Sequence, residues 1–156
     1  MTSNQPIFDA IVNFFTQDNW SFTQIKKQST LRLAFKGKNG KCDCYAQVRE
    51  KEKQFIFYSV CPTQVPKTKR RVVGEFLLRI NHEKVIGGFD LDFNNGEIRY
   101  KTSISFNNKS LTSDTIKDLV YTNLMMMERY LPGIRLVISG FISPEEALAE
   151  TENLAE

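Results

Sequence analysis

The first part of the chain changes from helical to strand-like spacing of its hydrophobic residues. In residues 1–18, apolar side chains recur every three or four positions after a proline suited to a first helical turn, which predicts an amphipathic helix. Residues 20–61 hold two runs with apolar side chains at every second position and a third run that is almost continuously apolar, with turn-forming residues at 37–40 and charged residues at 49–53. Because such short connections join antiparallel neighbours, we expect three antiparallel strands.

The same succession of patterns returns in the middle of the chain. Residues 68–84 have apolar side chains at helical spacing, and Gly87-Gly88 is expected to end this helix. Residues 88–106 alternate again on both sides of Asn95-Gly96, a pair that tolerates the positive φ angles of a tight turn. The pattern predicts a β-hairpin after the helix.

The last part of the chain is helical in pattern. Residues 112–131 carry an apolar stripe behind hydroxyl residues suited to an N-cap, and Pro132-Gly133 is expected to end this long helix. Residues 133–139 suit either a further helical turn or a short strand. Short C-terminal helices are expected over residues 133–155.

Together these elements predict an α+β fold in the order α-βββ-α-ββ-α, with a twisted antiparallel sheet and flanking helices. The chain has 156 residues, of which 41% are hydrophobic and 12% aromatic, which is enough for one sizeable core. The pattern contains no repeat. We therefore expect a single domain over residues 1–156.

Cysteine usage and hydropathy indicate where the protein works. No stretch approaches the ~20 apolar residues needed to cross a bilayer, so no membrane association is expected. Three cysteines cannot all pair, and Cys42 and Cys44 lie too close on one strand to favour a bridge. Their spacing is also shorter than that of usual metal-binding pairs, so we expect them to fill the core and to bind no metal. Free thiols are typical of a reducing compartment, which predicts a cytoplasmic protein.

Two further polar features fall short of known catalytic and metal-site motifs. The run from Asp90 to Gly96 resembles a calcium-binding loop, but its glycine comes one place late and Lys101 stands where a bidentate glutamate is required. His82 is the only histidine, and no nucleophile motif accompanies it. We expect no enzyme activity and no cofactor.

A basic run at the start of the middle helix is a candidate binding surface. Lys67, Lys69, Arg70 and Arg71 could contact nucleic-acid phosphates or an anionic surface. The run has no interleaved aromatic residues, and a solvated helix start is the simpler interpretation. Nucleic acid is therefore not the expected partner.

The long helix supplies a second candidate surface. Beyond the apolar stripe that faces the core, this helix has three more large side chains, Tyr121, Met125 and Met126. Methionines suit an adaptable interface. Pairing with a second copy is the commonest way to cover such a patch. We expect a homodimer formed through this helix or through the exposed face of the sheet.

The second half of the chain resembles the YbjN family. The similarity covers residues 68–149 well, whereas residues 1–67 match mainly in element order. The matching segments are Val72–Asn81 (VVGEFLLRIN), Gly88–Leu91, Gly96–Tyr100, the helix from Leu111 and the ending Leu131–Ala147.

This resemblance implies a fold like that of the class I type III secretion chaperones, which are small α+β proteins that commonly dimerise. It also implies a sensory-transduction or secretion-chaperone-like regulator without a settled biochemical activity. The long helix and the aromatic content look most like cyanobacterial members. No catalytic signature comes with the resemblance.

We therefore expect a non-enzymatic protein-interaction module with a chaperone-like or regulatory role and a protein partner that the sequence does not identify. The alternative is a regulator that binds nucleic acid or an anionic surface through Lys67–Arg71. A more distant alternative is an enzyme that uses His82.

Overall fold

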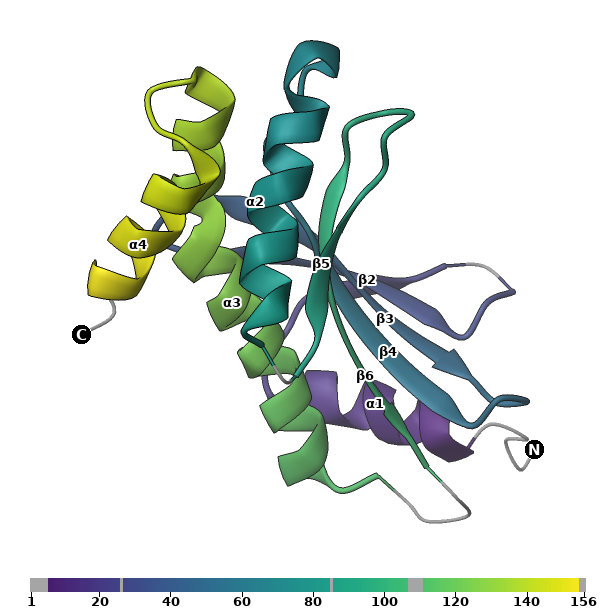
Figure 1. The fold of residues 1–156 in the computed structure, drawn as a ribbon. Coiled ribbons are helices and arrows are strands. Elements are labelled where there is room, and N and C mark those ends of the chain that lie inside the picture. The colour runs from purple at the N-terminus through teal and green to yellow at the C-terminus, as the bar shows by residue number, and fades with distance from the viewer. Residues whose placement is uncertain (1–5, 26, 85, 107–110, 155–156) are drawn as a thin grey trace.

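The computed structural model describes residues 6–25, 27–84, 86–106 and 111–154, and its framework is a six-stranded sheet with helices packed against it (Figure 1). All neighbouring strands are antiparallel, in the spatial order β1-β2-β3-β4-β6-β5, which confirms the predicted α+β class. The strands are β1 (Phe22–Gln24), β2 (Thr30–Lys36), β3 (Lys41–Arg49), β4 (Gln54–Val60), β5 (Gly88–Leu91) and β6 (Ile98–Ser105). The helices are α1 (Pro6–Gln17), the 3-10 turn η1 (Lys67–Lys69), α2 (Arg70–His82), α3 (Ser113–Ser139) and α4 (Pro144–Leu154).

The inner face of the sheet carries the core. Alternate residues of β3 from Cys42 to Val48 are buried, because successive side chains of a strand point to opposite faces. The Phe15 ring of α1 stacks on Phe57 of β4 with centroids 6.2 Å apart. In Figure 1, α2, α3 and α4 stand together on one side of the sheet, and α1 lies beside the first half of α3.

The outer face of the sheet carries a ladder of stacked side chains. Tyr45 of β3 and Tyr58 of β4 stack with ring centroids 5.0 Å apart, and the Arg99 guanidinium of β6 lies 4.9 Å from the Tyr58 ring. Cross-strand pairs of this kind contribute about 0.2–1 kcal/mol each. Because β4 lies between β3 and β6, the Tyr58 ring is covered from both sides and is not free to stack on a nucleic-acid base.

One of the strands in residues 20–61 was not predicted. Residues 20–61 hold four strands rather than three, because β1 pairs with β2 from Phe22, opposite Leu33, to Gln24, opposite Leu31. A segment of three residues is too short to show alternation, so its hydrophobic pattern carried no signal.

The prediction that Pro132 ends the long helix is wrong, since α3 continues through it to Ser139. A proline inside a helix lacks the N–H that would bond to the carbonyl oxygen four residues earlier, here that of Glu128. Asn39, in the turn between β2 and β3, replaces that donor: its Nδ2 donates to Glu128 O at 2.9 Å and its backbone N–H to the Glu128 carboxylate at 2.6 Å. Residues 133–139 are therefore helical rather than a strand, and one helix, α4, follows them among the described residues.

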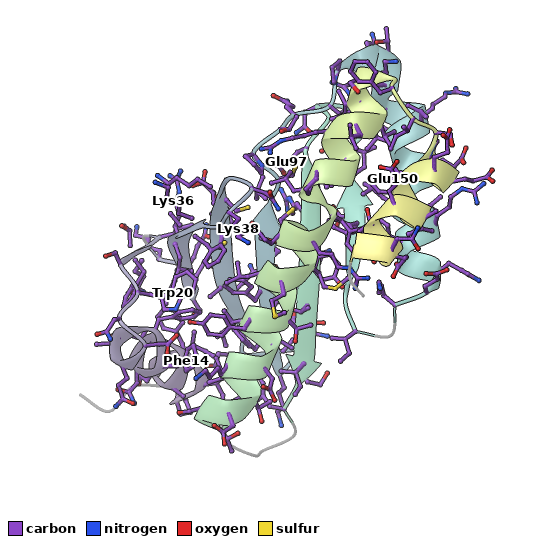
Figure 2. The ribbon with its side chains drawn as sticks, turned by 90° about the vertical axis from the view of Figure 1, so that its left-hand side faces the viewer. Phe14, Trp20, Lys36, Lys38, Glu97 and Glu150 are labelled. Atoms are coloured by element: carbon purple, nitrogen blue, oxygen red, sulfur yellow. The ribbon has the colours of Figure 1, made fainter. Side chains whose placement is uncertain are left out.

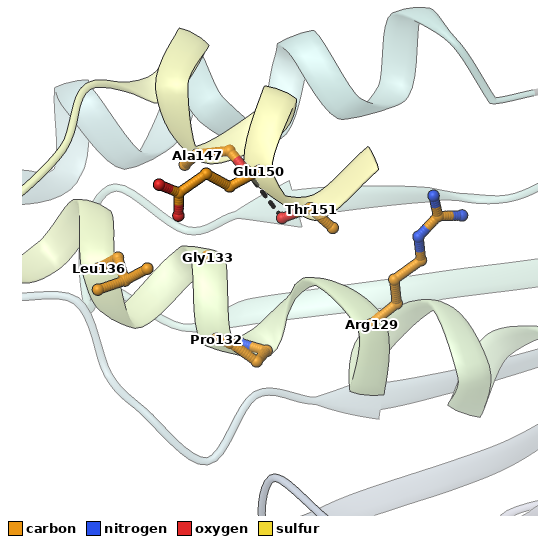
Figure 3. A pocket seen from close by; sticks show the side chains of 7 residues that line it. All are labelled: Arg129, Pro132, Gly133, Leu136, Ala147, Glu150 and Thr151. Carbon is orange, nitrogen blue, oxygen red and sulfur yellow. Dashed lines mark hydrogen bonds between the residues drawn. The ribbon is translucent and has the colours of Figure 1, made fainter. Parts of the chain in front are cut away.

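The second half of α3 approaches α2 and α4 closely. A Cβ at Gly133 would lie 2.9 Å from Phe76 Cζ of α2 and 3.2 Å from Thr151 Oγ1 of α4, so the contact requires a glycine. Figure 3 shows the cavity of about 140 Å³ that remains between α3 and α4. Its lining residues are Arg129, Pro132, Gly133, Leu136, Ala147, Glu150 and Thr151.

A buried polar network holds α3 against the sheet. The Nδ2 of fully buried Asn123 donates to the carbonyl oxygens of Phe57 and Tyr100, each at 2.9 Å. Ser59 Oγ donates to Asn123 Oδ1 at 2.7 Å, and Thr102 Oγ1 donates to a carbonyl of α3. Each of these buried groups therefore has a partner, which is what such a network needs to be stabilising.

Candidate functional site

An open apolar groove lies between α2 and the edge strand β5, and we call it the α2/β5 groove. Its volume is about 680 Å³, which lies in the range of ordinary binding pockets, roughly 300–1,000 Å³. From α2 it is lined by Arg71, Gly74, Glu75, Leu77, Leu78 and Asn81. From β5 and the turn after it, it is lined by Phe89, Asp90, Leu91 and Phe93.

Leu78, on the outward side of α2, forms part of one wall of this groove. The inward stripe of the helix buries Val73, Phe76, Leu77 and Ile80 against the core. Leu78 lies off that stripe and is 71% exposed. The helix therefore presents an apolar side chain to solvent in addition to the stripe it buries.

A glycine in the middle of α2 shapes the floor of the groove. Glycine in a helix interior costs about 1 kcal/mol relative to alanine, so it needs a local reason. A Cβ at Gly74 would lie 3.3 Å from Phe93 Cζ and 3.8 Å from Leu91 Cδ2. The missing side chain thus leaves room for the Phe93 ring, which leans over the helix and remains 55% exposed.

The free edge of β5 borders the groove, and the backbone groups of Phe89 on this edge are already hydrogen-bonded. The side-chain amide of Asn81 accepts the Phe89 N–H and donates to the Phe89 carbonyl, both at 2.8 Å. Because alternate residues of an edge strand face outward, the backbone groups of Leu91 face the same way as those of Phe89. The amide therefore protects the edge at Phe89 and leaves a short open stretch at Leu91.

Charges at the rim of the groove are unevenly paired. Glu75 accepts a hydrogen bond from Arg79 at 2.8 Å, and Asp90 lies 3.4 Å from Lys101. Arg71 is exposed and has no ion-pair partner among the described residues. The N-terminal end of the groove therefore carries an uncompensated positive charge.

A second hollow lies on the other side of Leu78, between α2 and α4, and we call it the α2/α4 hollow. Its volume is about 400 Å³. It is lined by Glu75, Leu78, Arg79, His82, Glu83 and Leu148. Leu78 thus stands as a ridge with a depression on each side.

The structure divides the predicted basic run into two kinds of residue. Arg70 is half-buried, and its guanidinium donates to the carbonyl oxygens of Val65 at 3.1 Å and Phe93 at 3.0 Å, so it holds the β5–β6 turn in place. Lys67 and Arg71 are exposed, and Lys69 is half-exposed. A polyanion would therefore meet only three of the four charges.

The predicted surface on α3 is also divided. The Tyr121 hydroxyl donates to Asp18, which also accepts the Trp20 Nε1–H at 3.0 Å, so Tyr121 holds the chain that follows α1. Met126 is half-buried against the core, and Met125 is 70% exposed. Figure 2 shows α3 across the front of the molecule, with Trp20 on one side of it and Glu150 of α4 on the other.

The cysteines lie where the alternation predicts. Cys42 and Cys44 are both buried on the inner face of the sheet, and Cys61 is buried as well. Burial raises the pKa of Cys42 to about 11 and raises the pKa values of the other two thiols, which keeps all three protonated at neutral pH. Within the described ranges, no three His, Cys, Asp or Glu side chains are grouped so that they could hold a metal ion.

The groove is not evident from the sequence, although two residues of α2 are consistent with it. Gly74 interrupts a helix without ending it, and Leu78 is apolar at a position that the inward stripe does not use. Neither shows by itself that β5 lies alongside α2, which depends on the strand order. The α2/β5 groove is thus a property of the tertiary arrangement.

The chain has been compared with known proteins. Residues 8–136 match the YbjN family, described as "Putative bacterial sensory transduction regulator". The sequence has no significant match among curated proteins. In the part of the chain that the structure describes, no helix is both long enough and apolar enough to span a bilayer.

Three solved structures share the fold at low sequence identity. The crystal structure of YbjN from E. coli, described as a putative transcription regulator, has a TM-score of 0.59 at 14% identity, over 81% of this chain and 89% of that chain. The ExsC–ExsE complex has a TM-score of 0.61 at 10% identity, over 85% of this chain and 96% of the other. The HopA1–SchA chaperone–effector complex has a TM-score of 0.54 at 12% identity, over 86% and 98%.

These matches agree with the resemblance seen in the sequence. The chaperone–effector complex and the ExsC–ExsE complex both share this fold, so the fold is chaperone-like, as expected. The family match spans most of the chain, from within α1 to the second half of α3. The chain belongs to the YbjN family.

Proposed function

We propose that this chain is a non-enzymatic protein-binding module of the cytoplasm, with a chaperone-like or regulatory role, and that it works as a homodimer. The observation that carries the proposal is the exposure of large apolar side chains on two helices, Leu78 on α2 and Met125 on α3. Exposed apolar surface marks an interaction site where it is contiguous, as around the α2/β5 groove, which Leu78 and Phe93 both line. The chaperone–effector complex among the structures of similar fold supports a protein partner.

Leu78 and Met125 lie on different helices, so the domain has two separate surfaces that could each bind another protein. Met125 stands beside half-buried Met126, whose unbranched side chain can repack against an incoming surface. Tyr121 lies one helical turn earlier and adds an aromatic edge to the same area. We assign this α3 surface to the partner protein.

Capture from the native cell extract tests this assignment. The tagged chain is expected to retain one defined protein in stoichiometric amount, and Met125→Glu is expected to abolish retention because it places a charge in the apolar contact. Lys117→Ala, an exposed change on the same helix, is the matched control and should retain the partner. Failure of the unmodified chain to retain any stoichiometric protein would contradict the proposal.

The alternative function remains binding of a polyanion through Lys67, Lys69 and Arg71. It is favoured by the exposure of Lys67 and Arg71 without an ion-pair partner among the described residues. Anisotropy of labelled single-stranded DNA, measured at about 50 and 200 mM salt, tests it, because phosphate contacts weaken steeply with salt. Salt-dependent binding that Arg71→Ala reduces would favour this function over the first.

A further inference from the structure

We infer that a basic band across the second half of α3, completed by the exposed side chain of Phe141, binds single-stranded RNA. The band runs from the turn between β2 and β3, along α3, to the 3-10 turn η1. The inference rests on the alternative function, the binding of a polyanion near the start of α2, and it names the ligand and the extent of the surface. The cations of the basic band are Lys36, Lys38, Lys41, Lys67, Lys69 and Arg135.

The β2–β3 turn supplies three of these cations. Lys36 at the end of β2 stands directly opposite Lys41 at the start of β3, and Lys38 lies in the turn between them. All three are exposed, and none has an ion-pair partner among the described residues. Like charges directly opposite each other on neighbouring strands are destabilising. A bound anion would therefore relieve a repulsion that the fold itself leaves uncompensated.

Helix α3 connects this turn to the start of α2. The Arg135 guanidinium donates to the Asn39 carbonyl oxygen, in the β2–β3 turn, at 2.7 Å. Just over one helical turn further along, a Cβ at Gly140 would lie 3.3 Å from Lys69 Nζ. The band therefore passes from the β2–β3 turn along α3 to η1, where exposed Lys67 extends it.

Phe141 supplies the aromatic side chain that the basic run lacks in the sequence. It directly follows Gly140, the left-handed C-cap of α3, and is 83% exposed, the largest exposed fraction of any large apolar residue in the described part of the chain. In Figure 1, the turn between α3 and α4 and the start of α2 lie at the same end of the molecule, at the top. An exposed ring can stack on an unpaired base, because every base has a π-face. The fold thus brings an aromatic ring to cations that are far from it in the sequence.

The acidic side chains beside the band are already engaged. Glu128 accepts a backbone N–H of the β2–β3 turn at 2.6 Å. Glu97 and Glu145 each lie within 3.2 Å of an arginine, and Glu146 accepts a backbone N–H at the start of α4. A polyanion that approaches the band therefore meets lysines without ion-pair partners and carboxylates that already have partners.

The composition of the band favours a nucleic acid over a membrane or an acidic protein. Small or polar residues of the turn, such as Asn39 and Gly40, lie between the cations, and Phe141 projects at one end. A membrane-bound surface buries several apolar side chains, and a protein interface has an apolar centre. Repeated phosphates match a line of cations, and RNA presents unpaired bases in its single-stranded loops, where aromatic side chains stack on them.

Two pairs of lysine substitutions that remove the same charge test the position of the surface. Lys38→Ala with Lys69→Ala removes two cations of the band, whereas Lys51→Ala with Lys117→Ala removes two exposed cations from the β3–β4 turn and the first half of α3. Binding of a labelled, unstructured single-stranded RNA is measured by anisotropy between about 50 and 200 mM salt. The first pair should weaken binding at least ~10-fold and reduce the slope of log Kobs against log salt by about 1.4, since each single-strand phosphate contact contributes about 0.7. The second pair should leave both unchanged.

The aromatic contact is tested separately, at a residue so exposed that its substitution disturbs the fold little. Phe141→Leu keeps an apolar side chain but removes the stacking surface, so it should weaken RNA binding at least ~5-fold. Phe141→Trp keeps a ring and should retain binding. Heparin is a polyanion without bases, so Phe141→Leu should bind it as tightly as the unmodified chain does.

Other outcomes overturn the inference in distinguishable ways. Equal weakening by the two pairs of lysine substitutions would show a response to net charge alone. Binding of heparin without binding of RNA, or RNA binding that Phe141→Leu leaves unchanged, would keep the polyanion function and remove the RNA site. Tighter binding of anionic phospholipid vesicles, or of DNA of the same sequence, than of RNA would assign the band to that ligand. Absence of all these ligands together with normal capture of a partner protein through Met125 would remove the polyanion function and leave the protein-binding function standing.

Discussion

Helices α2 and α3 both leave large apolar side chains in solvent, yet they are attached to the rest of the molecule differently. α3 reaches into the sheet through the fully buried amide of Asn123 and is joined to the segment after α1 by the Tyr121 hydroxyl. α2 packs by its apolar stripe, and its amide Asn81 bonds to the edge of the sheet rather than to its interior. α3 is therefore anchored at the centre of the fold, and α2 at its border.

This difference determines what the exposed side chains can do. The neighbours of Met125 on α3 are largely used inside the molecule, so Met125 offers a small and adaptable contact. Leu78 on α2 has a depression on each side and a second exposed apolar residue, Phe93, across the groove. A patch at the border of a sheet can remain apolar over a larger area, because no strand of the described residues pairs with the outer edge of β5 to cover it.

The largest expected effect comes from the anchor of α3. Asn123→Leu removes the amide that bonds to two strands and leaves the Ser59 hydroxyl and two carbonyl groups without this partner. Loss of a buried network member of this kind should lower the free energy of unfolding by about 3 kcal/mol. Urea unfolding at one fixed protein concentration measures it, because association would otherwise shift the midpoint.

The matched control is Asn13→Leu, which changes the same side chain on the exposed face of α1. It should alter the free energy of unfolding by no more than about 0.5 kcal/mol. If Asn123→Leu costs as little as this control, α3 is not anchored through the sheet, and the contrast between the two helices is lost.

A smaller effect is expected from the corresponding amide of α2. Asn81→Ala should cost about 1–2 kcal/mol, since it leaves the half-buried N–H and C=O of Phe89 to solvent. Hydrogen exchange gives the specific readout: the Phe89 amide should exchange faster, while the Asp90 amide, which faces β6, should not. Unchanged exchange at Phe89 would show that Asn81 does not protect the edge.

Periodicity was sufficient to predict most of the fold. The alternation of Cys42, Cys44, Ala46 and Val48 correctly indicated which face of β3 is buried. Periodicity failed at β1, which is too short to have a period. The expectation that a proline ends a helix failed at Pro132, because a distant residue replaces the missing hydrogen-bond donor. The Asn39 side chain that replaces the missing donor lies 89 positions from Glu128, and no local pattern reveals such a contact.

The candidate site was less predictable for the same reason. Counting apolar positions on the long helix identified Tyr121, Met125 and Met126 as surplus. The Tyr121 hydroxyl, however, bonds to Asp18 after α1, and Met126 packs against the core. The groove beside α2 depends on β5 being the last strand of the sheet, which follows from pairing with β6 rather than from the pattern of either element. The apolar positions of one helix do not show where the sheet beside it ends.

A still smaller effect is expected where α3 meets the segment after α1. Tyr121→Phe removes the hydroxyl that donates to Asp18 but keeps the ring beside Trp20, with centroids 6.4 Å apart. The loss should be about 1 kcal/mol, typical of one hydrogen bond at a half-buried site. Trp20 is the only tryptophan, so its fluorescence during unfolding reports this region directly. If the substitution instead left stability unchanged and abolished partner capture, Tyr121 would belong to the binding surface rather than to the fold.

The smallest effect is expected at the end of α2. His82 is exposed, lines the α2/α4 hollow and occupies the last position of the helix. His82→Ala should change the free energy of unfolding by no more than about 0.5 kcal/mol, because an exposed residue at a polar helix end makes few buried contacts. Urea unfolding beside the unmodified chain at the same concentration measures this. A loss of several kcal/mol would mean that the solvent-facing side of α2 is fastened to the fold near His82. α2 would then resemble α3 in its attachment, and the free surface along α2 would be smaller than the groove and hollow indicate.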